Sequence, residues 1–427
     1  MYIVYSLLLA CVALLSMPWW AFQMLRLGKY RAGFGERLGR VPGRLKSIGP
    51  QGPIWIHAVS VGEVLAVSQL VAELNKQYPD RAVFVSTTTA TGQQLARQRF
   101  GQDHVFYMPL DFGFALRPYL KKLRPDLLIL AETEFWPNLI HLSRRQGAAT
   151  AIVNARISDG SFPRYRRFRG FFSRVLSEVD LFLAQTGADA QRLAEIGAPQ
   201  DRVHISGNLK FDIRLSSAST LMGPLRQAIG QDSPVIVCGS TTEGEEELVL
   251  AAFQKVLDQF PKAVMIVAPR HPERFEKVAG MIESAGLKSI RRSAWQESTP
   301  VSGCVFLLDS VGELAALYAL ADLAFVGGSL APAGGHNILE PAQYGVAVLT
   351  GPHTFNFREI TRIFIEGGGL SVVTGESMAE EFLDLLRDGP RREQLGNRAK
   401  ELFRRNTGAT RKTLEALAPL LEGRGSQ

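Results

Sequence analysis

The 427-residue sequence is poor in cysteine and lacks the usual motifs for phosphate and dinucleotide binding. Its three cysteines, Cys11, Cys238 and Cys304, have neither zinc-ligand nor disulfide spacing, and the histidines have no ligand-like spacing. No G-x-G-x-x-G follows a strand-like run, and no G-x-x-x-x-G-K-[ST] occurs. We therefore expect no metal, a reducing compartment, and neither P-loop nor dinucleotide chemistry.

Acidic residues are scarce in one short segment, which accounts for almost all of the net charge of +7. Between residues 26 and 46 a single acid, Glu36, stands among the basic residues Arg26, Lys29, Arg31, Arg37, Arg40, Arg44 and Lys46. The rest of the chain is close to neutral, which argues against a broad nucleic-acid-binding surface. We expect no nucleic acid partner.

The segment from Met1 to Leu25 contains no Lys, Arg, His, Asp or Glu. As a helix, residues 2–25 would be ~36 Å long, enough to cross a hydrocarbon core of ~30 Å. Aromatic residues near both ends, and positive charge after the run, favour a single-pass anchor with the bulk of the protein in the cytoplasm over a cleaved signal peptide. Pro18 leaves a second interpretation open, a helix that lies in one leaflet without crossing.

Past residue 50, short apolar runs alternate with amphipathic helical patterns, which predicts parallel sheets covered by helices on both faces. The predicted strands lie at 53–59, 82–88, 105–110, 127–132, 148–154, 180–185, 202–207, 234–240, 263–270, 305–310, 323–329, 347–351 and 370–374. The predicted organisation is α/β, with an anchor at 1–25, a basic juxtamembrane segment at 26–50, doubly wound Rossmann-like domains at 51–208 and 234–404, a linker at 209–233 and a C-terminal helix at 405–427. Ligands of such sheets bind beyond the carboxyl ends of the strands.

Four loops at strand ends of the second domain carry small and polar residues that could expose backbone N–H groups to phosphate: GSTTEGEE, PRHPERF, DSVGEL and GGSLAPAGGHNILEPAQYG. Arg270, at the end of its strand, could clamp a phosphate or form a salt bridge with Glu273. Glu340, just ahead of Pro341, could accept hydrogen bonds from a ribose diol or only complement a helix N-terminus. We favour ligand binding for both.

The stretch FPRYRRFRGFFSR at 162–174 interleaves five arginines with five aromatic residues. One interpretation is contact with an anionic membrane surface through Arg164, Arg166, Arg167 and Arg169. Single-stranded nucleic acid is a second, and an amphipathic helix whose aromatic residues belong to the core is a third. The apolar N-terminal segment makes the lipid interpretation the preferred one.

Glu63 ends the stretch WIHAVSVGE, which follows the first strand of the first domain. The residues from Ser60 to Glu63 match the capping box S-x-x-E, and such a match is more often structural than catalytic. The position at a strand end also suits a catalytic carboxylate. The motif alone leaves both roles open.

Taken together, the motifs of this chain resemble those of the 3-deoxy-D-manno-octulosonic acid (Kdo) transferases, from the N-terminal segment to about residue 405. The matching stretches are HAVSVGE, ETEFWPN, NARIS, GNLKFD, TTEGEE, PRHPERF, FVGGSL, GGHNILEP and GPHTFNF. The resemblance implies a GT-B glycosyltransferase of the inner membrane that moves Kdo from CMP-Kdo to a lipid A precursor, without a metal or other cofactor. It gives no indication of oligomeric state.

The same resemblance implies roles for particular residues. Glu63 corresponds to the general base of the family. The implied CMP contacts are Pro269, Arg270, Val311, Gly312, Glu313, Asn337, Ile338, Leu339 and Glu340. A helix N-terminus would lower the pKa of Glu63 slightly, so we expect this carboxylate to be ionised at neutral pH.

Two other functions remain open. One is a membrane-associated GT-B transferase that uses a UDP-sugar and a lipid acceptor. The other is a membrane-tethered binding protein without turnover, for which Glu63→Gln would change nothing.

Overall fold

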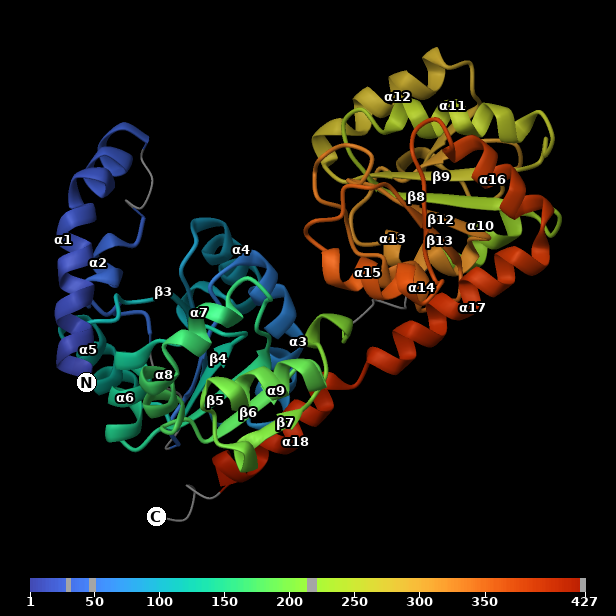
Figure 1. Ribbon diagram of the computed structural model, residues 1–427. Helices are drawn as coiled ribbons and strands as arrows, with labels where there is room; N and C mark the ends of the chain where they lie inside the picture. Colours follow the sequence, from blue (N-terminus) through green and yellow to red (C-terminus); the bar gives the residue numbers. More distant parts are fainter. Residues whose placement is uncertain (28–31, 46–50, 213–220, 423–427) are drawn as a thin grey trace. The chain divides into compact units, whose positions relative to one another are not determined.

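The computed structural model describes residues 1–27, 32–45, 51–212 and 221–422, and the chain folds as two compact units (Figure 1). Unit 1 comprises Met1–Ile213 with Thr407–Gln427, and unit 2 comprises Arg214–Asn406. Within the described residues each unit is built on a seven-stranded parallel sheet. The predicted fold class is confirmed: the protein is α/β, with two Rossmann-like domains.

The sheet of unit 1 has the strand order β3-β2-β1-β4-β5-β6-β7. Its strands are β1 Ile54–His57, β2 Val83–Thr87, β3 Val105–Tyr107, β4 Leu127–Ala131, β5 Ala149–Ala155, β6 Leu181–Ala184 and β7 Val203–Ile205. The chain proceeds outward from β1 to β3 and then returns to β4 on the other side of β1. The direction of winding therefore changes between β1 and β4, where sheets of this kind bind ligands.

Helices cover both faces of this sheet. They are α3 Val61–Gln77, α4 Ala90–Phe100, α5 Gly113–Leu123, α6 Pro137–Arg145, α7 Phe162–Arg167, α8 Arg169–Leu176, α9 Gly187–Ile196 and α18 Ala409–Glu422. Successive side chains of β1 enter opposite cores, since Ile54 and Ile56 pack on one face and Trp55 on the other. Two buried faces explain why the strands are continuously apolar in sequence.

Unit 2 repeats this design, with the strand order β10-β11-β9-β8-β12-β13-β14 and the change of winding between β8 and β12. The strands are β8 Val235–Thr241, β9 Val264–Pro269, β10 Ser289–Arg291, β11 Val305–Leu307, β12 Leu323–Val326, β13 Ala347–Thr350 and β14 Ser371–Val372. Strand β10 was not predicted from the sequence, because this short edge strand is only partly buried and has no apolar run. Short edge strands carry little periodic signal.

The helices of unit 2 are α10 Met222–Ile229, α11 Glu246–Leu257, α12 Phe275–Ser284, α13 Leu314–Leu317, α14 Leu339–Ala342, α15 Arg358–Glu366, α16 Met378–Arg387 and α17 Gly389–Asn406. Helix α10 falls inside the stretch 209–233 that the sequence pattern suggested as a linker, and its Leu225 and Ile229 join the core of unit 2. Residues 213–220 of that stretch lie outside the described residues.

The C-terminal helix α18 packs in unit 1, which the sequence did not indicate. Leu414 and Leu417 join the core beside α3. The carboxylate of Asp212 accepts hydrogen bonds from the N–H groups of Gly408 and Thr410, just before and at the start of the helix. Arg81 donates to the carbonyl oxygen of Leu421 near its end.

The N-terminal segment forms one long helix, α1 Tyr2–Leu27, whose part Tyr2–Trp20 is long and apolar enough to cross a membrane. The basic segment that follows is folded into unit 1 as far as it is described. Helix α2 Phe34–Arg37 contributes Arg37, which donates to the carbonyl oxygen of Thr88. Arg44 donates to the carbonyl oxygen of Val105 at 2.9 Å. Lys29, Arg31 and Lys46 lie outside the described residues.

Candidate active site

Glu63 lies in the first turn of α3, just beyond the carboxyl end of β1, and its exposed fraction is only 7%. One carboxylate oxygen, Oε2, accepts a hydrogen bond from the N–H of Val59 at 2.8 Å, and Oε1 accepts one from the Oγ of Ser60 at 3.0 Å. Ser60 has the extended backbone of an N-cap, but its side chain caps no helical N–H. The side-chain cap that the S-x-x-E match suggested for Ser60 is therefore not formed, and this hydroxyl donates to Glu63 instead.

The pKa of Glu63 is also opposite to the sequence-based expectation. It is raised from 4.5 to about 7, mainly by burial and to a smaller extent by the nearby carboxylates of Glu132 and Glu134. The hydrogen bonds from Val59 and Ser60 lower the pKa but do not offset the loss of water. The expected lowering by the helix N-terminus is thus wrong, because desolvation outweighs it.

A second group of polar residues lies at the carboxyl ends of β4 and β5. In the sheet, β4 is the neighbour of β1, and β5 follows β4. Glu132 follows β4 with a left-handed backbone (φ 58°), and its carboxylate pairs with the ammonium of Lys210 at 3.1 Å. Asn154, near the end of β5, also has a positive φ of 55°, and its Oδ1 accepts the N–H of Leu209. A left-handed backbone conformation costs a non-glycine residue ~1 kcal/mol or more of conformational free energy. Residues held in this conformation occur preferentially at functional sites.

No role was predicted for this second group, although ETEFWPN contains Glu132 and GNLKFD contains Lys210. The signal that could have revealed them is topological. Glu63 and Glu132 follow the two strands between which the winding direction changes. Acidic residues at both strand ends therefore marked this edge as a site.

His57, at the end of β1, is fully buried, and burial lowers its pKa to about 4, so the ring is neutral at pH 7. Its Nδ1 contacts the Oγ of Ser86 at 2.9 Å. Its Nε2 and the indole Nε1 of Trp136 have no hydrogen-bond partner among the described residues, and the two rings lie 5.5 Å apart.

In unit 2, a buried carboxylate binds the loop that follows β12. Glu245 accepts hydrogen bonds from the N–H groups of Gly328, Ser329 and Leu330, at 2.7 to 2.8 Å. The N–H and hydroxyl of Thr242 donate to the same carboxylate. We expected the N–H groups of this glycine-rich loop to be open to phosphate, and for these three groups that expectation is wrong.

Arg270 follows β9 and is exposed, whereas Pro269 is buried at the strand end. The alternative salt bridge of Arg270 to Glu273 is not formed: Glu273 lies near His271, at 3.8 Å. The guanidinium of Arg270 is close enough to Glu340 and His336 to lower the pKa of each. The structure thus brings Arg270 together with the GGHNILEP loop.

In that loop, Asn337 fixes the start of α14. Its Nδ2 donates to Oε1 of Glu340 at 3.2 Å, and its Oδ1 accepts the N–H of Leu339. Burial raises the pKa of Glu340 although Asn337 and Arg270 act against the change. Ile338 and Leu339 have buried side chains, so their contribution to any nucleotide contact is made through the backbone.

The loop after β11 carries the remaining predicted contacts. Val311 is 79% exposed, and Gly312 has a φ of 95°, which a side chain would strain. Glu313 is held by Arg292, with both contacts at 3.3 Å, and by the hydroxyl of Ser310. Pro269 ends β9, Arg270 follows it, and this loop follows β11. Because β9 and β11 are neighbours, these residues lie at one edge of the sheet.

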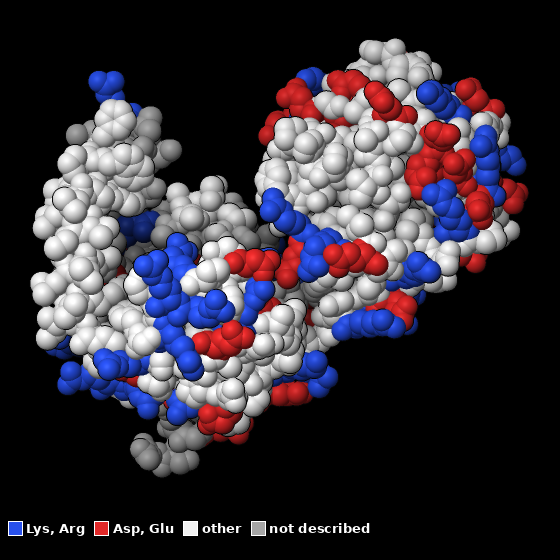
Figure 2. Space-filling view, in the orientation of Figure 1, with Lys and Arg blue, Asp and Glu red and all other residues white. Residues whose placement is uncertain are grey.

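The stretch 162–174 forms two short helices, α7 and α8, rather than one amphipathic helix. Phe162, Tyr165, Phe171 and Phe172 pack against the core of unit 1, and only Phe168 is largely exposed, at 55%. The arginines are exposed, and they are Arg164, Arg166, Arg167, Arg169 and Arg174. Figure 2 shows Lys and Arg side chains gathered over this part of unit 1.

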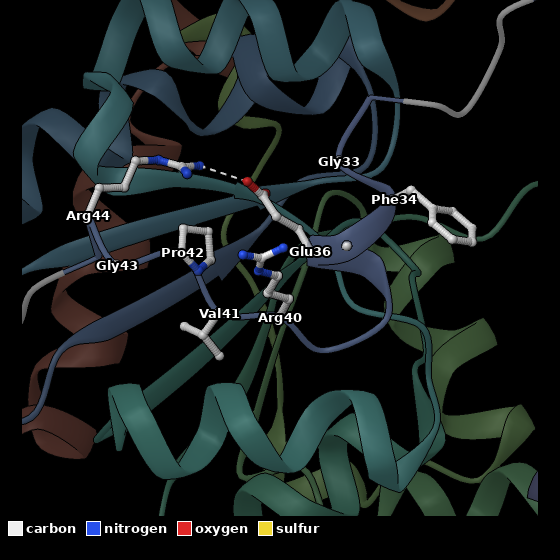
Figure 3. A pocket seen from close by; sticks show the side chains of 9 residues that line it. Gly33, Phe34, Glu36, Arg40, Val41, Pro42, Gly43 and Arg44 are labelled. Carbon is white, nitrogen blue, oxygen red and sulfur yellow. Dashed lines mark hydrogen bonds and ion pairs between the residues drawn. The ribbon is translucent and has the colours of Figure 1, made fainter.

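A pocket lies within the basic segment, lined by Gly33–Glu36 and Arg40–Arg44 (Figure 3). The Glu36 and Arg44 side chains meet across it in an ion pair of 3.0 Å. None of the predicted site residues lines this pocket. It therefore adds no support to the site at the sheet edges.

Comparison with known proteins agrees with the motifs. Residues 32–213 match the family model described as 3-deoxy-D-manno-octulosonic-acid transferase (kdotransferase), and residues 229–402 match glycosyl transferases group 1. The 3-deoxy-D-manno-octulosonic acid transferase of Haemophilus influenzae is 37% identical over 422 residues, which cover 98% of each chain. The one from Bordetella pertussis is 36% identical over 397 residues, or 90% of each chain.

Among solved structures, the UDP-GlcNAc 2-epimerase of Neisseria meningitidis is 15% identical, with a TM-score of 0.52 over 86% of this chain and 99% of that one. This likeness shows the two-domain fold alone. The C-terminal CMP-Kdo binding domain of WaaA from Acinetobacter baumannii is 37% identical and covers 42% of this chain and 98% of that one, with a TM-score of 0.40. By its sequence matches over nearly the whole length, the chain belongs to the 3-deoxy-D-manno-octulosonic acid transferases, a family of GT-B glycosyltransferases.

Proposed function

We propose that this protein transfers Kdo from CMP-Kdo to a lipid A precursor, with Glu63 as the general base. Family membership supports the sugar and the type of reaction. The observation that carries the role of Glu63 is its raised pKa, about 7, in a buried carboxylate beside the change of winding in the sheet. A general base with a pKa near the working pH is ionised in a large fraction of the molecules and still has a high affinity for the proton that it removes.

The proposed chemistry needs a proton acceptor for the attacking hydroxyl of the lipid. The oxygens of Glu63 are fixed by Val59 and Ser60, so the carboxylate does not have to reorganise during reaction. A pKa of about 7 is still far below that of an alcohol, so proton transfer accompanies bond formation instead of preceding it. Lys210, paired with Glu132, supplies a cation at the same sheet edge.

For the nucleotide, we propose that Pro269, Arg270, Val311, Gly312, Glu313, Asn337, Ile338, Leu339 and Glu340 contact CMP. Arg270 is exposed and forms no salt bridge with Glu273, so its guanidinium is available to the phosphate. Glu340 is oriented by Asn337 and suits a ribose diol. The departing CMP would leave with its charge stabilised by Arg270, without a metal or cofactor.

For the acceptor, we propose that the exposed arginines of α7 and α8 bind the phosphates of the lipid at an anionic inner-membrane surface. Their aromatic neighbours are mostly packed inward, so the contact is electrostatic rather than by aromatic insertion. Replacing Arg166 and Arg167 by serine should raise the KM for lipid acceptor presented in membranes. Unchanged kinetics would contradict this role.

The decisive experiment incubates membranes that contain the full chain with CMP-Kdo and a tetra-acylated lipid A precursor, followed by mass spectrometry of the lipid. We expect mass increments of whole Kdo residues and inhibition by CMP but not by UDP. A preference for UDP would favour a transferase of UDP-sugars. Absence of any Kdo addition by folded, membrane-bound protein would defeat the proposal.

A further inference from the structure

The first three turns of helix α1 have two different faces, whereas nearly all described side chains beyond Ala10 are exposed. Tyr2, Tyr5, Ser6, Leu9 and Ala10, spaced three and four residues apart, are partly buried and form one stripe. The large apolar side chains between and beyond them are exposed, among them Ile3 (77%), Leu7 (61%), Leu8 (63%), Leu14 (64%) and Leu15 (84%). The polar atoms of the first three turns are therefore directed at the protein, and the apolar side chains away from it.

The N-terminal end of α1 is bound to unit 1 by specific polar contacts. The hydroxyl of Tyr2 donates to Glu178 at 2.7 Å, and that of Tyr5 donates to Asp111 at 3.0 Å. The side chain of Asn138 donates to the Oγ of Ser6 at 3.0 Å. Asp111 and Asn138 are themselves buried, at 2% and 5% exposure, so the side chains that receive α1 are fixed by the core of unit 1. Figure 1 shows the N-terminal end of α1 beside α5 and α6.

The ring of Tyr2 also stacks on His141 of α6, with 3.9 Å between centroids. The ring of Tyr5 lies 5.9 Å from that of Phe171 in α8, the helix whose arginines are exposed. The first turns of α1 thus lie beside α8, which carries part of the basic stretch.

The other end of α1 is tied to the same unit through the chain. Only five residues, 28–32, lie between Leu27 and Gly33, so the Cα atoms of these two residues are at most ~21 Å apart. The segment that begins at Gly33 is folded against the sheet of unit 1: the carboxylate of Glu36 accepts the N–H of Tyr107 in β3 at 2.7 Å. A helix that spans a membrane has its ends on opposite sides of ~30 Å of hydrocarbon, and so short a connection cannot return across that distance.

We propose that α1 is an in-plane anchor: it lies along one leaflet of an anionic membrane, on the same side as unit 1, with its N-terminal end docked on that unit and its other end joined to it by a short segment of chain. Its exposed apolar face enters the leaflet, where Trp19 (53% exposed) and Trp20 (40%) suit the interface. The exposed arginines beside its first turns match the negative charge of the lipid headgroups. This replaces the single-pass anchor favoured from the sequence, and it does not depend on which sugar the enzyme transfers.

The face on which residue 1 lies can be measured with the otherwise unaltered chain. A protease-cleavable epitope is placed before Met1, and the chain is expressed in a Gram-negative host. We expect protease to remove the epitope in inverted inner-membrane vesicles and to leave it intact in spheroplasts. An epitope placed after Gln427, in the same unit as the docking site, gives the matched cytoplasmic control. Removal of the N-terminal epitope in spheroplasts, or its protection in inverted vesicles, would overturn the proposal.

The docking contact is tested in the same membranes by disulfide formation. In a Cys11→Ser background, where Cys238 and Cys304 are buried, Ser6→Cys is combined with Asn138→Cys. We expect oxidation to link residues 6 and 138 and to shift the mobility of the chain on a gel. The matched pair Ile3→Cys with Asn138→Cys uses the exposed side of the helix and should not link. Equal linking of both pairs, or of neither, would contradict the proposed face.

Discussion

Glu63 in unit 1 and Glu245 in unit 2 occupy corresponding places but have different surroundings. Each lies where a helix begins after the first strand of its sheet, and each is buried, with exposures of 7% and 0%. Within the described residues, Glu245 accepts five hydrogen bonds and Glu63 accepts two. The two sheets therefore use the same position for different purposes.

The difference shows that the number of hydrogen-bond donors around a buried carboxylate, and not burial alone, decides whether the carboxylate holds a loop or can exchange a proton. Glu245 binds three successive N–H groups of the loop after β12, and so it holds the loop that leads to the predicted nucleotide contacts. Glu63 loses water without gaining enough donors, so its pKa rises to about 7 and it can exchange a proton near neutral pH. A structural glutamate and a candidate base thus arise at one topological position.

The largest effect is expected for Glu63→Gln. Glutamine can still accept from the N–H of Val59, and its amide can donate to Ser60, so the fold should persist. Loss of the proton acceptor should slow transfer by roughly 10²- to 10⁴-fold. Turnover with CMP-Kdo and lipid acceptor measures this effect, and CMP affinity should stay unchanged. Full activity would leave Glu63 as only a structural residue.

Glu245→Ala should act on stability instead of chemistry. It leaves the N–H groups of Gly328, Ser329 and Leu330 buried without their acceptor, which should cost unit 2 about 3–5 kcal/mol. Calorimetric unfolding of the full chain measures this loss. Glu243→Ala is the matched control in the same loop: its partner Lys277 is at 2.7 Å, but the pair is exposed and should contribute little. Equal losses in both variants would contradict the structural role of Glu245.

The pH dependence of transfer and of stability tests the raised pKa of Glu63. If transfer needs ionised Glu63, its rate should rise with pH up to about 7 and then level off, with about a hundredfold gain between pH 5 and 8. The contribution of Glu63 to the free energy of unfolding should instead decrease as the pH rises. Because the folded pKa lies above the unfolded value of 4.5, Glu63 contributes stability below pH 4.5 that is lost as the pH rises through about 7.

Unfolding temperatures of the parent and of Glu63→Gln, compared from pH 5 to pH 8, measure this loss. The variant should become relatively more stable as the pH rises. A constant difference between the two proteins would show that Glu63 does not titrate in this range.

Much of this fold was predictable from the sequence because parallel strands buried on both faces are continuously apolar. The runs around Trp55 and Val237 were recognised for that reason, and the short edge strand Ser289–Arg291 was missed because it lacks such a run. The position of Glu63 at a strand end was also predictable, since a strand followed by a capping box places it there.

The state of Glu63 was not predictable, because it depends on how much water the folded chain removes. The same limit applies to the loop after β12: its glycines suggested an open phosphate site, but Glu245, more than eighty residues earlier in the sequence, takes up the N–H groups. Local patterns do not specify such long-range partners. The docking of the N-terminal end of α1 was likewise not predictable, since Tyr5 and Asp111 are 106 residues apart.

The smallest effect, and the finest test of the comparison, is expected for Ser60→Ala. The hydroxyl of Ser60 lowers the pKa of Glu63, so its removal should move the midpoint of the pH–rate profile to higher pH. Stability should change little, since this side chain caps no N–H of α3. Thr89→Ala is the matched control, because Thr89 is a true cap whose Oγ1 accepts the N–H of Gly92 at 3.1 Å in α4. That variant should lose ~1 kcal/mol of stability and keep the midpoint of the pH–rate profile. If Ser60→Ala behaves like Thr89→Ala, then Ser60 acts as a helix cap after all, and donors to Glu63 do not set its proton affinity.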